Sequence, residues 1–415
     1  MRKFILLTSL LLLSLSTFAE HKDEVLKNNS KDDSRIEELP LDELVTLTDV
    51  YAQIKKVYVN ELSDKEILEN AIKGMLSNLD KHSRYLSEDG FEQLEESARG
   101  EYGGIGIRAD HLDDAIYVRY IFDDSPAQKA GLKLNDKIVA VDGQSTEGLT
   151  VDEGSELLRG IPNSKLKLTI ISEDSDEPKQ VSLKRKIIQF TSVSYELIEP
   201  NIGYARIGEF QTRTAKDLTQ AITKMEKDNK APLKGFILDL RNNPGGILDM
   251  AVAVSDLFLH EGVIVYTRGR LPDSNQEFRA TSGDILRSRP LVVLINGISA
   301  SASEIVSGAL QDHKRALIIG EQSYGKGSVQ TIYPIHGGGG IKLTTALYYT
   351  PNDRSIRDLG ITPDIKVEYL EFAGELAEGE ASYKVDNQVV AAVEALSKSD
   401  KSEQSGKGSD KGVTN

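Results

Sequence analysis

Short apolar runs that alternate with helical patterns are the feature that most constrains the fold of this chain. Residues 235–240 and 291–295 are apolar over nearly their whole length, as strands buried on both faces are. A helical pattern over residues 247–259 follows the first run, and another reaches residue 311 after the second. Residues 316–319 add a third buried run. Repeated strand–helix units of this kind predict an α/β domain, a sheet covered by helices.

The rest of the 415-residue chain divides by changes in this pattern. Apolar residues recur at three- and four-residue spacing before residue 98, and short alternating strands follow. We therefore expect a signal peptide (1–19), a linker (20–38), an N-terminal helical region (39–98), a strand-rich domain (99–184), an α/β core (185–368), and a C-terminal helix with a disordered tail (369–415).

The first residues have the pattern of an export signal. Arg2 and Lys3 precede an apolar stretch over residues 4–15, and Ala19 closes a small-residue cleavage site. The apolar stretch is shorter than the roughly 20 residues that span a bilayer. The sequence thus predicts cleavage after Ala19 and export to a bacterial periplasm, with a retained inner-membrane anchor as the alternative.

Charge and cysteine content exclude several classes of function. The formal net charge is −15, which disfavours nucleic acid as a partner. The chain contains no cysteine, so disulfides, thiolate metal sites and a cysteine nucleophile are excluded.

A serine cluster lies between the second buried run and its helix. Ser299, Ser301 and Ser303 stand among small residues at this strand-to-helix turn. Such turns expose a side chain and direct helix N–H groups at a developing negative charge, as a serine nucleophile requires. The spacing alone does not choose one of the three serines, and a serine-rich helix cap has the same pattern.

Lys326 is the candidate base for this nucleophile. None of the six histidines has a recognisable triad context, whereas Lys326 lies between Gly325 and Gly327 directly after the third apolar run. A lysine in a poorly hydrated loop has a lowered pKa and can accept a proton. Gln330, four residues later, is placed to orient it. An ordinary exposed loop lysine is the alternative.

Two similar motifs are rejected. Gly320 to Lys326 resembles a P-loop, but Gly327 replaces the hydroxyl residue that binds Mg²⁺. Ser323 and Lys326 match an S-x-x-K motif, but its companion S-D-N and K-T-G elements are absent from the sequence.

Three linked motifs resemble the carboxy-terminal processing peptidases. They are residues 239–246, 296–305 and 325–330, and the similarity runs to about residue 368. It implies a crotonase- or ClpP-like core and a serine endopeptidase without metal or cofactor. The site residues that it implies are Ser301 as nucleophile, Lys326 as general base, Gln330 as its orienting partner, and Gly245, Gly246 and Ala302 as oxyanion donors. The departures, Ile298 and Tyr324, do not affect these positions.

The strand-rich domain resembles a PDZ module inserted before the core. Residues 102–107 match its carboxylate-binding loop, and residues 125–143 match its later signature. Consecutive amides of a glycine loop can hold a peptide's terminal carboxylate while the peptide adds a strand to the sheet. The resemblance implies that the free C-termini of protein substrates bind at Tyr102, Gly103, Gly104, Ile105 and Gly106. Arg159 is a candidate for coupling an occupied groove to the active site.

Two other classes of function compete with a tail-specific peptidase. A non-catalytic PDZ scaffold predicts a damaged dyad, and a thioester-cleaving crotonase offers no use for the PDZ module.

The helical region suggests a homodimer but no chemistry, and its lone His82 has the context of a structural residue. Whether a partner protein activates the enzyme is left open.

Overall fold

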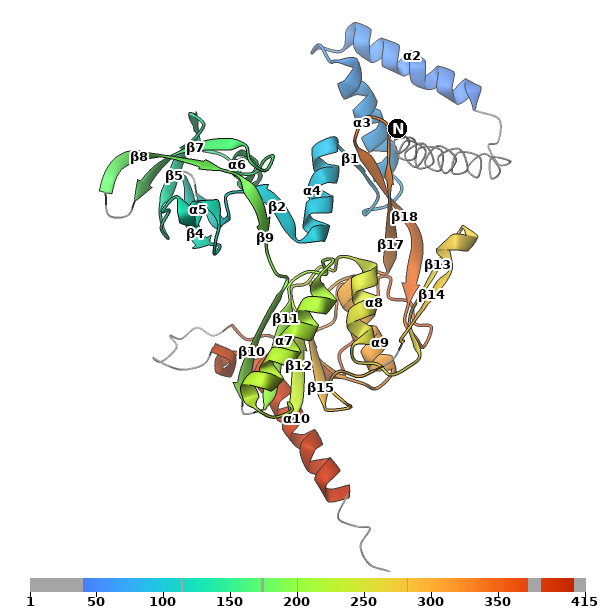
Figure 1. The fold of residues 1–415 in the computed structure, drawn as a ribbon. Helices are drawn as coiled ribbons and strands as arrows, with labels where there is room; N and C mark the ends of the chain where they lie inside the picture. Colours follow the sequence, from blue (N-terminus) through green and yellow to red (C-terminus); the bar gives the residue numbers. More distant parts are fainter. Residues whose placement is uncertain are drawn as a thin grey trace, which may run out of the picture. The chain divides into compact units, whose positions relative to one another are not determined.

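The computed structural model describes residues 40–112, 115–172, 175–199, 201–281, 283–371 and 382–406. The predicted signal peptide and most of the linker therefore lie outside the described residues. The chain divides into two compact units, residues 1–74 and 75–415. The class is mixed α/β, as the sequence predicts (Figure 1).

The first unit contains the predicted helical pattern. Helix α2 (Leu41–Val57) has acidic residues in its first turn and lysines in its last, which complements the helix dipole. Helix α3 (Asp64–Ser77) begins in this unit, and Asp64 accepts hydrogen bonds from Tyr51 and Lys55 of α2. No residue of α2 is buried, so its apolar stripe, which includes Leu44, is exposed.

A six-stranded sheet forms the core of the second unit. Its order is β10 (Val193–Glu199), β11 (Ile202–Ile207), β12 (Gly235–Asp239), β15 (Leu291–Ile295), β16 (Leu317–Gly320) and β19 (Ile365–Lys366). All neighbours are parallel except β10 and β11. The three apolar runs thus become adjacent central strands, and the carboxyl ends of β12 and β15 lie at the same edge.

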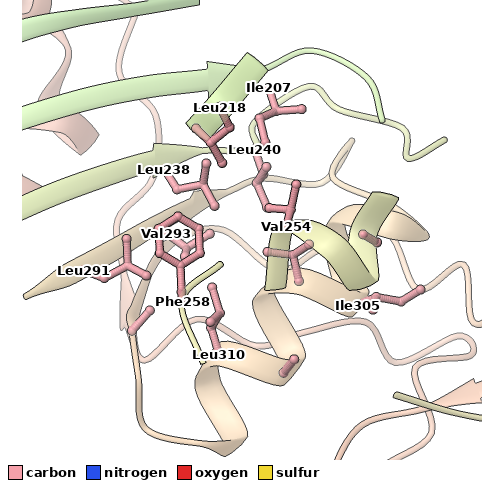
Figure 2. Close-up of a cluster of buried hydrophobic side chains, with 14 of the residues drawn as sticks. Ile207, Leu218, Leu238, Leu240, Val254, Phe258, Leu291, Val293, Ile305 and Leu310 are labelled. Atoms are coloured by element: carbon pink, nitrogen blue, oxygen red, sulfur yellow. The ribbon is translucent and has the colours of Figure 1, made fainter. Parts of the chain in front are cut away.

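Helices cover both faces of this sheet. Alternate strand residues such as Leu238 and Val293 pack with α7 (Thr214–Asn229), α8 (Leu248–Asp256) and α9 (Ala302–Asp312), and Figure 2 shows this cluster around Phe258. The intervening residues pack with α10 (Asn387–Gly406), which follows the short helix η2 (Ser382–Val385). Helix α10 lies within residues 369–415, where a C-terminal helix and a disordered tail are expected. Residues 407–415 lie outside the described part.

A second sheet follows the loop around Lys326 and contains an unexpected strand. Strand β18 (Gly340–Tyr349) pairs with β13 (Val263–Gly269) and β17 (Ser328–Pro334), and β14 (Gln276–Arg279) pairs with β13 after the short helix η1 (Pro272–Ser274). The segment predicted to be helical supplies the fifth strand, β1 (Arg84–Leu86), which pairs antiparallel with β18. Helix α4 (Glu88–Arg99) follows, capped by Ser87 and ended by left-handed Gly100.

The PDZ-like domain has a sheet and a hydrophobic core of its own. Its strands are β3 (Ile107–Leu112), β4 (Ala115–Ile121), β5 (Lys137–Val141), β6 (Gln144–Ser145), β7 (Lys165–Ser172) and β8 (Ser175–Lys184). Its helices are α5 (Pro126–Lys129) and α6 (Val151–Leu158), which a capping box between Thr150 and Glu153 starts. A ribbon of β2 (Glu101–Gly104) and β9 (Lys186–Gln189) brackets the domain.

Among the residues that the structure describes, no helix is both long enough and apolar enough to span a membrane.

Candidate active site

The three clustered serines differ sharply in geometry. Ser299 and Ser303 are fully buried, and their hydroxyls donate to the carbonyls of Leu240 (2.8 Å) and Asn243 (2.9 Å). Ser301, the residue before α9, has φ 55° and ψ −112°, a conformation that costs a non-glycine residue energy and is typical of functional sites. It is 7% exposed. This geometry favours Ser301 among the three.

Gly245 lies directly against the Ser301 turn. It has φ 115°, and a Cβ added there would lie 2.8 Å from Cβ of Ser301 and 3.2 Å from the Ala302 nitrogen. Only glycine fits so close an approach in this backbone conformation. The side chain of Asn243 fixes the turn, because its Oδ1 accepts from the Gly245 N–H at 2.8 Å while its backbone carbonyl accepts from Ala300 at 3.0 Å.

The three predicted oxyanion donors differ in availability. The Gly245 N–H is already bonded to Asn243. The parallel bridge beside Gly246 uses the N–H groups of Phe210 and Ile247, so the Gly246 N–H takes no part in it. Ala302 is the first residue of α9, where an N–H has no partner within the helix. Gly246 and Ala302 therefore present the more available donors.

Lys326 is held in a tight loop, as its flanking glycines suggest. The Gly325 carbonyl accepts from Asp358 at 2.9 Å, and the Gly327 carbonyl accepts from Tyr348 at 2.8 Å. A Cβ at Gly327 would lie 2.1 Å from the nitrogen of Arg357, so the loop threads closely past this turn. The backbone on both sides of the lysine is therefore fixed.

The environment of the Lys326 amine disfavours its charged form. The side chain is half-buried. Burial, first, and the positive charge of Arg84, second, lower the pKa of Lys326 below the ordinary 10.5, while the nearby Glu304 opposes this shift. A lowered pKa increases the share of neutral amine, which is the form that accepts a proton.

A single buried carboxylate links the serine turn to the lysine loop. Glu304 is 0% exposed and accepts from the backbone N–H groups of Ser301 (2.8 Å), Gly325 (2.6 Å) and Lys326 (2.9 Å), and from the Ser323 hydroxyl (2.6 Å). Burial raises the pKa of Glu304, and these four donors oppose the rise. Glu304 thus fixes the backbone of both candidate catalytic residues at once.

The side chains of the proposed dyad are near the same carboxylate but are not bonded to each other. Among the residues that the structure describes, no hydrogen bond joins Nζ of Lys326 to Oγ of Ser301. The Ser301 hydroxyl instead lies close enough to the Tyr348 phenol to lower its pKa, although burial raises that pKa more strongly. The Gln330 amide nitrogen donates to Ser328, at 2.8 Å to the hydroxyl and 3.1 Å to the carbonyl. Only its amide oxygen is left to orient the lysine.

Sequence reasoning missed three basic residues near Lys326. Burial and, after it, the charge of Lys326 lower the pKa of His82 and of Lys342. The charge of Arg84 adds to the effect of burial on the pKa of both lysines. His82 and Arg84 come from the segment expected to be helical and without chemistry. Their partners lie more than 200 residues away in the sequence, so no local pattern could have found them.

The predicted tail-binding residues line a groove in part. A cavity of about 350 Å³ is bordered by Tyr102 and Ile105, with apolar Ile107 and Leu158 and the guanidinium of Arg159. Arg159 stacks over the Tyr102 ring at 5.1 Å. Gly103, Gly104 and Gly106 do not line this cavity. The Gly103 N–H donates to Glu96 at 3.1 Å, and Gly106 packs against Ser125 with φ 78°.

A resident metal would need a cluster of ligating side chains. Within the described ranges, no group of three or more histidine, aspartate or glutamate residues could hold an ion.

Models of known families match the α/β core, the PDZ-like domain and the N-terminal region of this chain. The chain matches the model of peptidase family S41 over residues 201–367, the PDZ domain over residues 93–171, and the N-terminal domain of the activating protease CtpB over residues 8–90.

Several curated proteins are similar over most of their length. A carboxy-terminal-processing protease of Bartonella bacilliformis is 46% identical over 329 residues, which are 79% of this chain and 75% of the relative. The carboxy-terminal processing protease CtpA of Bacillus subtilis is 33% identical over 89% of this chain and 77% of its own length. Among solved structures, a photosystem II D1 C-terminal processing protease is 28% identical with a TM-score of 0.47, covering 78% of this chain and 86% of that one.

Proposed function

This chain belongs to the carboxy-terminal processing proteases of peptidase family S41, serine peptidases with a PDZ domain, and we propose that it cuts proteins whose free C-termini its PDZ groove has captured, using a Ser301–Lys326 dyad. The observation that carries the proposal is the Glu304 carboxylate. It accepts from the backbones of both residues, so the strained serine and the half-buried lysine form one site.

The reaction begins with a proton transfer. The neutral Lys326 amine takes the hydroxyl proton as Oγ of Ser301 attacks the substrate's carbonyl carbon. The carbonyl oxygen becomes an oxyanion, which the N–H groups of Ala302 and the Gly245–Gly246 turn stabilise. When the intermediate collapses, the C–N bond breaks and Lys326 gives its proton to the leaving amine, which leaves an acyl-enzyme on Ser301.

Water completes the cycle by the same route. Neutral Lys326 takes a proton from a water molecule, whose oxygen attacks the acyl carbon, and Ser301 leaves with the proton restored. Hydrogen bonds in catalytic sites often tighten only when substrate is bound. The amine must therefore move onto the Ser301 hydroxyl in the substrate complex, with the Gln330 amide oxygen as the acceptor that orients it.

The PDZ groove supplies substrate selection. A peptide adds a strand beside the sheet, its last side chain fills the apolar cavity lined by Ile105 and Leu158, and its carboxylate meets the N–H groups of the 102–106 loop. Because residues 101–104 pair with β9 and Glu96 holds the Gly103 N–H, the amides of Ile105 and Gly106 carry the carboxylate.

Two variants and two substrates test the proposal. Purified wild type, Ser301→Ala and Lys326→Ala are incubated with an unstructured protein whose C-terminus is free or amidated. We expect cleavage of the free-ended substrate by wild type alone, and unchanged tail binding by both variants. Undiminished cleavage by either variant would refute the dyad. Equal cleavage of both substrates would refute tail selection, and binding without cleavage by wild type would favour a scaffold.

Export, assembly and activation complete the proposal. The N-terminal pattern supports cleavage after Ala19 and a periplasmic location, and the exposed apolar stripe of α2 supports a homodimer. A periplasmic location and a homodimer are both compatible with activation by a partner protein. Mass spectrometry of the N-terminus in cell fractions tests export, and sedimentation of the purified chain tests assembly. A cytoplasmic chain with an intact N-terminus, or a monomer at micromolar concentration, would contradict these proposals.

A further inference from the structure

The start of helix α10 is bonded to the end of the strand that leads into the oxyanion turn. Arg241 lies between β12 and the Gly245–Gly246 turn. Its Nη1 donates to Oδ1 of Asp386 at 3.0 Å and to Oε1 of Gln388 at 2.9 Å. Its Nη2 lies 2.8 Å from Oδ2 of Asp386. The C-terminal segment therefore contacts the chain just before one of the proposed catalytic turns.

The same guanidinium is fixed to its own strand. Nε of Arg241 donates to both carboxylate oxygens of Asp239 at 3.0 Å, and Nη2 donates to Oδ2 at 2.6 Å. The Asp239 carboxylate also accepts from the backbone N–H of Arg241 at 2.9 Å and from the Tyr204 hydroxyl at 2.6 Å. Both Asp239 and Arg241 are buried. This network fixes the backbone where the chain leaves β12.

The cluster contains one carboxylate more than charge balance requires. Asp239 alone balances the charge of Arg241, so Asp386 is not needed to neutralise it. A buried ion pair seldom adds net stability over apolar residues of similar volume. A planar guanidinium bonded on several sides does fix geometry, because its five donors have fixed directions. Position explains the contact with Asp386 better than charge does.

A purely structural role for Asp386 is the alternative. Its Oδ1 accepts from the N–H groups of Gln388 (3.0 Å) and Val389 (3.2 Å), so it caps α10. A cap of this kind needs no arginine. The Gln388 side chain, in addition, bridges Arg241 and the Val367 carbonyl, to which its Nε2 donates at 2.7 Å. Two side chains at the start of α10 thus converge on one guanidinium.

The residue after Arg241 connects this network to the serine turn. The Asn242 N–H donates to Oδ1 of Asn296 at 2.9 Å, and Nδ2 of Asn296 donates back to Oδ1 of Asn242 at 2.8 Å. The Asn296 N–H donates to the Ser299 hydroxyl at 2.9 Å. A displacement of Arg241 would therefore reach the turns on both sides of the nucleophile.

We propose that Asp386 and Gln388 are positioning residues for the oxyanion turn, so that the C-terminal helix is a working part of the active site. They act through Arg241 and not on the reacting atoms. By fixing the end of β12, they hold the N–H groups of the following turn where the oxyanion develops. The proposal rests on the oxyanion role proposed above for the Gly245–Gly246 turn.

The test is steady-state peptide hydrolysis by the full chain. Asp386→Ser keeps a good helix cap, but its side chain is too short to bond Arg241 as the aspartate does. Gln388→Met keeps the side-chain length and removes the amide. Leu396→Ala is the matched control, because Leu396 is also on α10 but is buried against Gly235, at the other end of β12. It should loosen the helix away from Arg241.

Denaturant unfolding gives the folded fraction of each variant, by which the rates are corrected. We expect kcat to fall on the order of 10- to 100-fold in Asp386→Ser and Gln388→Met, with KM and tail binding unchanged. A peptide aldehyde forms a hemiacetal with Ser301 that mimics the oxyanion, so its inhibition should weaken by a similar factor, measured with a separate tail peptide present. Leu396→Ala should lower stability and keep both activity and inhibition.

Three results would overturn the inference. The first is a wild-type kcat in folded Asp386→Ser and Gln388→Met. The second is an equal loss in Leu396→Ala, which would reduce the effect to general stability. The third is a loss of kcat with unchanged inhibition by the aldehyde, which would place the effect outside the oxyanion turn.

The variants also separate this inference from the proposed function. If Asp386→Ser does not fold, Gln388→Met decides the question, because it leaves the cap of α10 in place. Any of the three results with Ser301→Ala inactive refutes the positioning role alone. An active Ser301→Ala refutes the proposed chemistry itself.

Discussion

Replacement of Glu304 by glutamine perturbs the link between the two proposed catalytic loops most directly. The carboxylate accepts four hydrogen bonds, two on each oxygen. An amide keeps one oxygen acceptor and turns an NH₂ group toward the other two donors. The change is nearly isosteric, so it removes hydrogen bonds without opening a cavity.

The size of the effect follows from this count. Two buried donors lose their acceptor at about 1–3 kcal/mol each, so Glu304→Gln should lower the free energy of unfolding by about 2–6 kcal/mol. Whichever pair is lost, a backbone segment of the serine turn or the lysine loop is released. A misplacement of about 1 Å in a catalytic group costs about 100-fold in rate, and we expect at least that loss in kcat.

The assay combines denaturant unfolding with peptide hydrolysis, both corrected for the folded fraction. Asp284→Asn is the matched control. The Asp284 carboxylate is also buried and accepts from Leu286 (2.8 Å), Ser288 (2.8 Å) and Arg315 (2.9 Å), but it holds no catalytic loop. It should lower stability and leave the activity of the folded fraction unchanged. A Glu304→Gln variant as stable and as active as wild type would refute the reasoning.

Three further predictions follow from single contacts. Gly245→Ala should reduce kcat by about 100-fold, because the added Cβ meets Ser301 at 2.8 Å, whereas Gly297→Ala, whose Cβ meets nothing closer than 3.9 Å, should stay active. Ser299→Ala should lower the free energy of unfolding by about 1–3 kcal/mol, because the Asn296 N–H loses its acceptor and the Leu240 carbonyl loses one of its two donors, yet keep peptide hydrolysis. The pKa of Lys326 is lower in the folded chain than in the unfolded chain, so the unfolded chain binds more protons between that pKa and 10.5. The free energy of unfolding should therefore rise with pH in this window, which calorimetry measures. Lys326→Met should lack this rise. A stable, inactive Ser299→Ala, or an unchanged pH dependence in Lys326→Met, would contradict these assignments.

Local patterns predicted the central strands and their helices well. Residues 291–295 form a strand with the predicted bounds, because a buried apolar run is a complete signal within a few residues. They also placed Gly325, Lys326 and Gly327 in a constrained loop.

Features that depend on distant packing were not predictable. Spacing could not single out Ser301, whose backbone strain arises where Gly245 packs against it. Strand β1 has only three residues, and its Arg84 pairs with Lys342 of the distant strand β18. The Gln330 amide nitrogen bonds Ser328, next to an irregularity in β17 that follows Val329. None of these contacts has a signal within its own segment.

Covalent trapping tests the central claim, that Lys326 deprotonates Ser301. A peptide fluorophosphonate with a free C-terminus is added to wild type and Lys326→Ala across pH 6–10, and mass spectrometry locates the adduct and measures its rate of formation. We predict an adduct on Ser301 alone, a rate that rises with pH to a plateau, and a loss of about 100-fold or more in the variant. An adduct on another residue, or equal rates in the two proteins, would contradict the account.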